Sequence, residues 1–251
     1  MVRLGREAVV RFVGVLIVKF PTNQSWCRGM LMDLCISPGV VAQDAIVEAL
    51  VFHGVDQPGA LDRSLLDDNT REGLASVLIF LPDPPVERIR RAAAAGPIST
   101  RRAFARLLGS LRRTEPGTGR ATPSPPWACD LLAEMIRTDK AWQVRADAAN
   151  GLGAAGDPVR CVPALTAALK DTDHFVRINT CKGLGLYGSV ARDAIPALIE
   201  MVRGLENEGL KGNPRRELEN NALVALKILT GKQFQTLNAF LAWYDYENPK
   251  K

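Results

Sequence analysis

Residues that could do chemistry are scarce in this chain. It has only two histidines, His53 and His174, and neither is followed by a second histidine four residues on or lies beside a glutamate, as a helical zinc or iron site requires. The glycines Gly151, Gly153 and Gly156 spell G-x-G-x-x-G, but a phosphate loop must join a strand to a helix and these residues end a predicted helix. No serine elbow or Cys/His arrangement is indicated. The sequence predicts no catalytic, metal or cofactor-binding residue, and we therefore expect a non-enzymatic protein.

The five cysteines are predicted to be small core residues: Cys27, Cys35, Cys129, Cys161 and Cys181. They include no C-x-x-C pair, which favours free thiols in a reducing compartment and a cytoplasmic location. The apolar run from residue 12 to residue 18 is too short to span a bilayer and is followed by no small-residue cleavage site. We expect it to be a buried helix.

Arginines are concentrated between residues 88 and 120, where nine arginines face one acid, Glu115. Arg102, Arg106 and Arg113 are spaced i, i+4 and i+11, so a continuous helix would present them on one face. Such a stripe could bind phosphates or an acidic partner, although arginine runs are usually solvated. The net charge is only +5 and stacking aromatics are nearly absent, so nucleic acid is the less favoured partner.

The stretch 161–188 contains the pattern that organises the chain. Proline at 163 predicts the first turn of one helix, and Asp173 is a typical N-cap for a second helix over 174–186. Counting from Arg145 and from Arg177, 32 residues later, the same residue types recur, at Ala149 and Cys181, Leu152 and Leu184, Gly153 and Gly185, and Gly156 and Gly188. A fixed period of this length indicates stacked helical hairpins.

The motif P-A-L, D, V-R, A/C, L-G, G over 127–203 resembles the HEAT repeat, in particular the bacterial form grouped with phycobilisome-lyase-like repeats. This resemblance implies an all-α, right-handed α-α superhelix, similar to armadillo repeats, of about six hairpins. The His-Glu dyads of di-iron hydroxylases with this fold are absent. The resemblance also implies a structural Asp–Arg ladder, formed by Asp139, Arg145, Asp171 and Arg177.

Spacing and composition divide the chain into five segments. Degenerate HEAT-like hairpins are expected over 1–113, with Gln43, Val47 and Leu50 on a second helix of a hairpin. A loop rich in Pro and Gly follows over 114–126, well-formed repeats over 127–203 and a polar loop over 204–214. The last hairpin and a cap are expected over 215–251, whose A-L-x-x-L-T-G-K-x-F and W-Y motifs are similar to the closing segment of many bacterial HEAT-repeat proteins.

The repeat pattern also predicts a surface. In each hairpin the face of the second helix opposite its core should line a groove. Exposed apolar residues there would anchor a protein partner, unless a flanking loop covers them. The predicted groove residues are Gln143, Asp147, Asn150, Phe175, Asn179, Lys182 and Leu186.

We therefore expect a scaffold or adaptor for protein interactions. The resemblance to phycobilisome lyases implies an alternative, an accessory subunit of a complex that handles tetrapyrroles. Phosphate-backbone binding through the arginine stripe is the third hypothesis.

Overall fold

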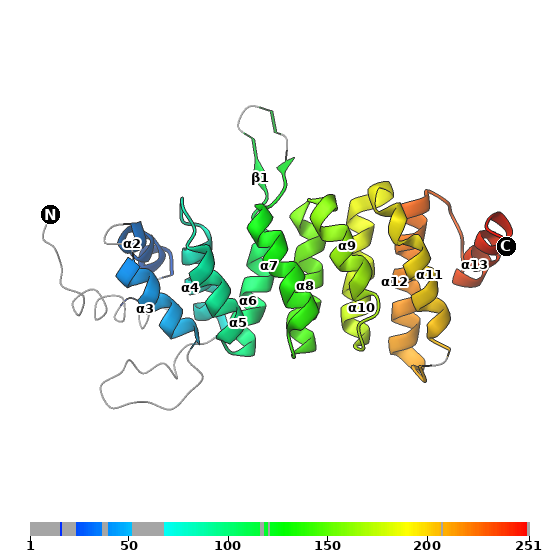
Figure 1. Cartoon of the computed structure of the whole chain (residues 1–251), viewed down its shortest axis with the longest axis horizontal. Helices are drawn as coiled ribbons and strands as arrows, with labels where there is room; N and C mark the ends of the chain where they lie inside the picture. The colour runs from blue at the N-terminus through cyan, green and yellow to red at the C-terminus, as the bar shows by residue number, and fades with distance from the viewer. Residues whose placement is uncertain are drawn as a thin grey trace, which may run out of the picture. The chain divides into compact units, whose positions relative to one another are not determined.

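The computed structural model describes residues 16, 24–36, 40–51, 68–115, 118–119, 121–206 and 208–249. The chain divides into two compact units, residues 1–107 and 108–251, which are described separately. Apart from one short hairpin of strands, every regular element of the described residues is helical (Figure 1). The fold class predicted from the sequence, an all-α solenoid, is confirmed. The described residues include no helix that is long and apolar enough to cross a membrane.

The first unit contains α2 (Gln24–Ile36), α3 (Val40–Val51), α4 (Asp68–Ile79), α5 (Val86–Ala95) and most of α6 (Ile98–Gly109). Helix α3 packs mainly against α5, and α2 against α4. In each hairpin we call the first helix A and the second helix B. Helix α5 is the A helix of the hairpin that it forms with α6, and α3 packs mainly against α5. Because neighbouring hairpins stack A helix on A helix, α3 is an A helix, and the prediction that Gln43, Val47 and Leu50 lie on a B helix is wrong. The helix expected over 12–18 lies outside the described residues, except for buried Leu16.

The second unit consists of three hairpins: α7 (Pro126–Thr138) with α8 (Trp142–Ala155), α9 (Pro158–Ala168) with α10 (His174–Tyr187), and α11 (Ile195–Gly204) with α12 (Gly212–Thr230). The B helices α8, α10 and α12 lie side by side, and α7 packs against α9 (Figure 1). As predicted, Asp173 caps α10, because its carboxylate accepts a 2.8 Å hydrogen bond from the Phe175 amide.

Helix α9 begins earlier than the sequence pattern suggested. Asp157 caps it by accepting a hydrogen bond from the Arg160 amide, and Pro158 occupies the first turn. Pro163 therefore lies inside the helix rather than at its start. Since proline has no N–H, the carbonyl of Val159 has no helical donor at residue 163.

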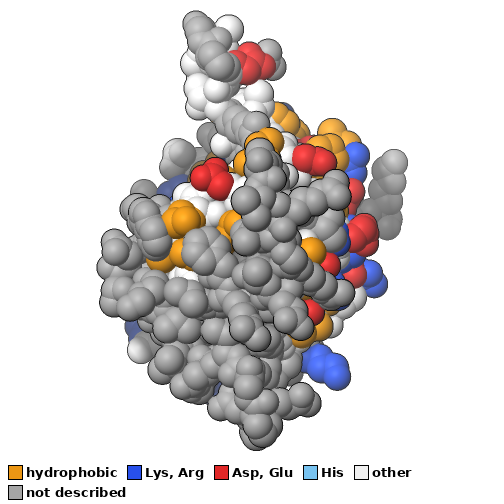
Figure 2. Space-filling model, turned by 90° about the vertical axis from the view of Figure 1, so that its left-hand side faces the viewer, with side chains coloured by type: hydrophobic (Ala, Val, Ile, Leu, Met, Phe, Trp, Pro, Cys, Tyr) orange, Lys and Arg blue, Asp and Glu red, His pale blue; other side chains and the backbone are white. Residues whose placement is uncertain are grey.

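The segment predicted as a loop over 114–126 contains two short strands. β1 (Arg113–Thr114) pairs antiparallel with β2 (Ala121–Thr122). The hairpin extends away from the helices of its unit in Figure 1 and forms the projection at the top of Figure 2. In the view of Figure 2, hydrophobic side chains of the described residues form small separate patches beside charged ones.

The chain ends in α13 (Leu237–Glu247), which packs against α12. Phe240 is buried, and its ring centroid lies 5.2 Å from that of Phe234 and 5.4 Å from that of Trp243. Asp245 forms an ion pair with Arg203 of α11. Because α12 begins at Gly212 and packs against α11, the last hairpin starts before the predicted boundary at 215, and α13 alone follows it.

Candidate functional site: the surface of the B helices

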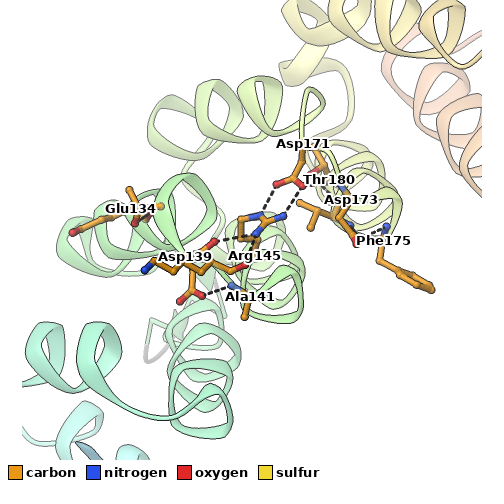
Figure 3. A network of polar contacts seen from close by, with 11 residues as sticks. Glu134, Asp139, Ala141, Arg145, Asp171, Asp173, Phe175 and Thr180 are labelled. Carbon is orange, nitrogen blue, oxygen red and sulfur yellow. Dashed lines mark hydrogen bonds and ion pairs between the residues drawn. The ribbon is translucent and has the colours of Figure 1, made fainter. Parts of the chain in front are cut away.

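Arg145 joins two successive hairpins, as the predicted ladder requires. Its Nε and Nη2 atoms donate to the two carboxylate oxygens of Asp171 at 2.7 and 2.9 Å, and its Nη1 donates to the Asp139 carbonyl at 3.0 Å (Figure 3). The hydrogen bond to Asp171 raises the pKa of Arg145. The side chains of Arg145 and Asp171 are only 15% and 10% exposed. This bidentate, shielded pair links the hairpin of α7 and α8 to that of α9 and α10.

The next rung of the ladder uses a residue that sequence reasoning missed. Arg177 is buried and donates through Nη1 to Glu208 at 2.8 Å. Glu208 lies in the long polar segment between α11 and α12. Because the repeat spacing is irregular there, the sequence did not show that Glu208 pairs with Arg177 as Asp171 pairs with Arg145. The Nε atom of Arg177, whose counterpart in Arg145 binds Asp171, is buried without a partner among the described residues.

The predicted arginine stripe is not formed. Helix α6 ends at Gly109, and Arg113 belongs to β1, so Arg113 does not share a helical face with Arg102 and Arg106. The reason is that residues 113–114 pair with residues 121–122 as a β-hairpin and do not continue helix α6. Arg106 is also engaged, since its Nη2 atom lies 2.6 Å from a carboxylate oxygen of Glu72.

The face assignment for the B helices agrees with the observed burial. Val144, Ala148 and Leu152 are fully buried on one side of α8. Of the predicted groove residues, Asn150, Phe175, Lys182 and Leu186 are exposed, whereas Gln143, Asp147 and Asn179 are partly buried. The Asn179 side-chain amide donates to the Ala146 carbonyl at 3.4 Å, so it contributes to the contact between α8 and α10.

Phe175 belongs to an aromatic cluster at the start of two B helices. Its ring stacks on that of Trp142 with centroids 5.1 Å apart, and the His174 ring lies 4.2 Å from it. Phe175 remains 42% exposed and Trp142 38% exposed. Figure 3 shows the Phe175 side chain directed away from the Arg145 network. Trp142 was not among the predicted groove residues. The 32-residue period aligns it with His174, so it could have been placed at the start of α8 as His174 is at the start of α10.

Leu186 belongs to an aliphatic group near the other end of the B helices. It is 71% exposed, and its Cδ1 atom lies 3.3 Å from where a Cβ on Gly153 would be. Ile228 of α12 is placed in the same way over Gly185 of α10, at 3.5 Å. Ile228 is 47% exposed, and Val224, one helical turn earlier, is 54% exposed. Val224 and Ile228 were not predicted, because the polar insertion before α12 disrupts the 32-residue period.

We define the B-helix surface by these exposed apolar residues of α8, α10 and α12. It presents two separate apolar groups, and polar residues such as Asn179 and Lys182 lie between them along α10. Large exposed apolar side chains that recur on neighbouring helices are typical of interaction surfaces. The defining residues are Trp142, Phe175, Leu186, Val224 and Ile228.

Chemistry is not indicated on this surface. The described residues contain no group of three or more His, Cys, Asp and Glu side chains that could hold a metal ion. All five cysteines are buried and free. Burial raises the pKa of Cys181 to about 12, so its thiol stays protonated at neutral pH and is a poor nucleophile.

Comparisons with known proteins support the repeat architecture. Residues 129–212 match the family model described as HEAT repeats. The match covers α8 to α11, almost all of α7 and the start of α12, and it includes both rungs of the Arg145 and Arg177 ladder. No curated protein matches the chain. The match and the stacked hairpins together support a HEAT-repeat protein.

Proposed function

We propose that this chain is a non-enzymatic scaffold that binds a protein partner on its B-helix surface. The observation that carries the proposal is the exposure of Phe175 and Leu186 on a helix whose opposite face is fully buried. Aromatic and aliphatic side chains fixed on a rigid helix lose little entropy on binding, which makes them efficient anchors. HEAT repeats are helical scaffolds often used for protein interaction, which supports the same function.

The experiment is quantitative co-purification from the native host with three forms of the chain. We expect one or more proteins to be captured by the wild type and lost with the double change Phe175→Ala/Leu186→Ala. Tyr246→Ala is the matched control, because Tyr246 is 84% exposed on α13, a helix that carries none of the residues that define the B-helix surface. If the same proteins were recovered with the double variant, the B-helix surface would not be the binding site.

Nucleic-acid binding is the competing proposal, and the arginine positions do not support it. A stripe of phosphate contacts should give a salt-sensitive electrophoretic shift. We expect no shift to survive at physiological salt. A shift that survives there and is removed by Arg102→Ala/Arg106→Ala would favour a phosphate-binding function.

The bacterial, phycobilisome-lyase-like subtype and the cytoplasmic setting are part of this proposal. Five buried, unpaired thiols support a reducing compartment. An absorbance scan of the co-purified complex tests the link to tetrapyrroles, because a bound bilin or haem is coloured. We expect a colourless complex, and a stoichiometric visible band would favour the tetrapyrrole alternative.

A further inference from the structure

The A helices of the second unit are unevenly packed. Helix α9 packs closely against α7 on one side but makes few contacts with α11 on the other. The 3₁₀ helix η3 (Gly188–Ala194) lies between α10 and α11. In the preceding repeat the α-helix α9 already begins at Pro158, so η3 takes the place of the first part of α11. It is η3, rather than α11, that packs against α9. The seam between α9 and α11 is therefore open on the A-helix side.

This open seam forms a hollow of about 830 Å³. Volumes of roughly 300 to 1,000 Å³ are usual for sites that bury a small ligand or a few side chains. Val159 and Val190, at either side of the hollow, are 83% and 65% exposed. Exposure of valine on both sides of one hollow leaves apolar surface that folding does not bury. The apolar lining includes Pro158, Val159, Val162, Pro163, Val190 and Pro196.

The charged groups at this hollow are mainly acidic. Asp193 is exposed and forms no ion pair within the described part of the chain. Glu200 has only a long contact with Lys170, at 3.5 Å, and both side chains are 69% exposed. A pair this exposed is weakly held. Two carboxylates and one ammonium group therefore give the hollow a local negative charge, although the whole chain has a net charge of +5.

The backbone offers one further feature. Because Pro163 lies within α9 and has no N–H, it donates no helical hydrogen bond to the Val159 carbonyl. An extended peptide could donate an amide N–H to that carbonyl, whereas a small apolar ligand has no donor for it.

We propose that the hollow between α9 and α11 is a second binding site, for a short partner segment that combines aliphatic side chains with Lys or Arg. The aliphatic side chains fill the space between Val159 and Val190, and the cation pairs with Asp193 and Glu200. The site is independent of the B-helix surface, because it is built from the A helices and η3. It gives the scaffold a second point of contact with its own charge preference.

The test uses two pools of fluorescent eight-residue peptides with Leu or Val at alternating positions. One pool has Arg at a central position and the other has Glu there. We expect the basic pool to bind the full chain saturably in fluorescence anisotropy, and at least tenfold more tightly than the acidic pool. Since the chain as a whole is positively charged, general electrostatic attraction would give the opposite preference.

Three variants locate the binding. Val190→Asp should weaken binding of the basic pool at least tenfold, and Asp193→Lys should remove the preference for the basic pool. Val224→Asp introduces the same charge at a similarly exposed valine of the B-helix surface, and it reports whether the peptides bind at that surface instead. Circular dichroism should show that each variant keeps its helix content.

Three results would overturn the proposal. The first is equal binding of the two pools, or no binding of either. The second is loss of binding with Val224→Asp but not with Val190→Asp, which would assign the peptides to the B-helix surface. The third is a dimer in sedimentation velocity that Val190→Asp dissociates, which would make a second copy of this chain the occupant of the hollow.

Discussion

Two equivalent glycines should respond in opposite directions to the same substitution. Gly153 and Gly185 occupy the same repeat position on α8 and α10. A Cβ on Gly153 would lie 2.6 Å from the Cα of Gly183, whereas a Cβ on Gly185 would meet only the Cδ1 atom of Ile228, at 3.5 Å. Carbon atoms are in optimal contact at about 3.5–4.0 Å. Gly153→Ala must therefore force α8 and α10 apart by about 1 Å, whereas Gly185→Ala fits the existing space.

The magnitudes follow from overpacking and helix propensity. Forcing an extra methyl group into a close-packed contact costs about 1–3 kcal/mol, and replacing glycine by alanine inside a helix contributes about 1 kcal/mol. Gly153→Ala should thus lower the free energy of unfolding by up to about 2 kcal/mol. Gly185→Ala should leave it unchanged or raise it by up to about 1 kcal/mol.

Urea denaturation followed by circular dichroism at 222 nm measures both changes, provided that each transition is fitted with the same slope. Equal destabilisation by the two variants, or a more stable Gly153→Ala, would refute the close approach of α8 and α10 on which the B-helix surface depends. A Gly185→Ala variant that lost more stability than Gly153→Ala would place the repeats in a different register.

Three further predictions concern the ladder, the cap and the thiols. Asp171→Ala leaves the shielded Arg145 without its carboxylate and should cost about 3 kcal/mol in urea denaturation, whereas the exposed Glu200→Ala should cost about 0–1 kcal/mol; equal costs would contradict a structural ladder. Removal of 232–251 exposes the apolar face of α12 and should cause aggregation in size-exclusion chromatography, whereas an unchanged monomer would show that α13 is not a cap. The Cys181 thiol should react with Ellman's reagent only after unfolding. Because burial raises its folded pKa from 9.0 to about 12, its contribution to stability is complete below pH 9 and should be lost as the pH rises towards 12.

Much of the second unit could be predicted from the sequence because its repeats keep a constant length. The 32-residue period aligned Arg145 with Arg177; in the structure Arg145 pairs with Asp171, whereas Arg177 pairs with Glu208, which the period did not predict. The same period placed Phe175 and Leu186 on the exposed face of α10. A regular period predicts side-chain positions because each hairpin packs mainly on its neighbours, so residues at the same repeat position have the same packing environment.

Some predictions were wrong where the period is interrupted, and one was wrong within the regular repeats. Arg113 was assigned to a helix because the residue spacing fits one, but the start and end of the insertion pair as strands. Glu208 and Ile228 were missed because the polar insertion before α12 lengthens the repeat, so the 32-residue spacing no longer aligns them with their equivalents. Pro163 was placed at the start of α9 because proline usually occupies a first turn, but Asp157 and Pro158 provide an earlier start. Spacing alone cannot show which of two prolines begins a helix.

The central claim is that the B-helix surface binds a protein partner through Phe175 and Leu186. The most direct measurement is the affinity of the purified partner, once captured, for the wild type and for Phe175→Ala/Leu186→Ala in isothermal titration calorimetry. Loss of two anchors at about 1–2 kcal/mol each should weaken binding about 30-fold or more. The thermal midpoint should fall only slightly, because Leu186 is 71% exposed and Phe175 loses only its contacts with Trp142 and His174. An unchanged affinity would contradict the claim, and so would a loss of affinity that occurs only together with unfolding.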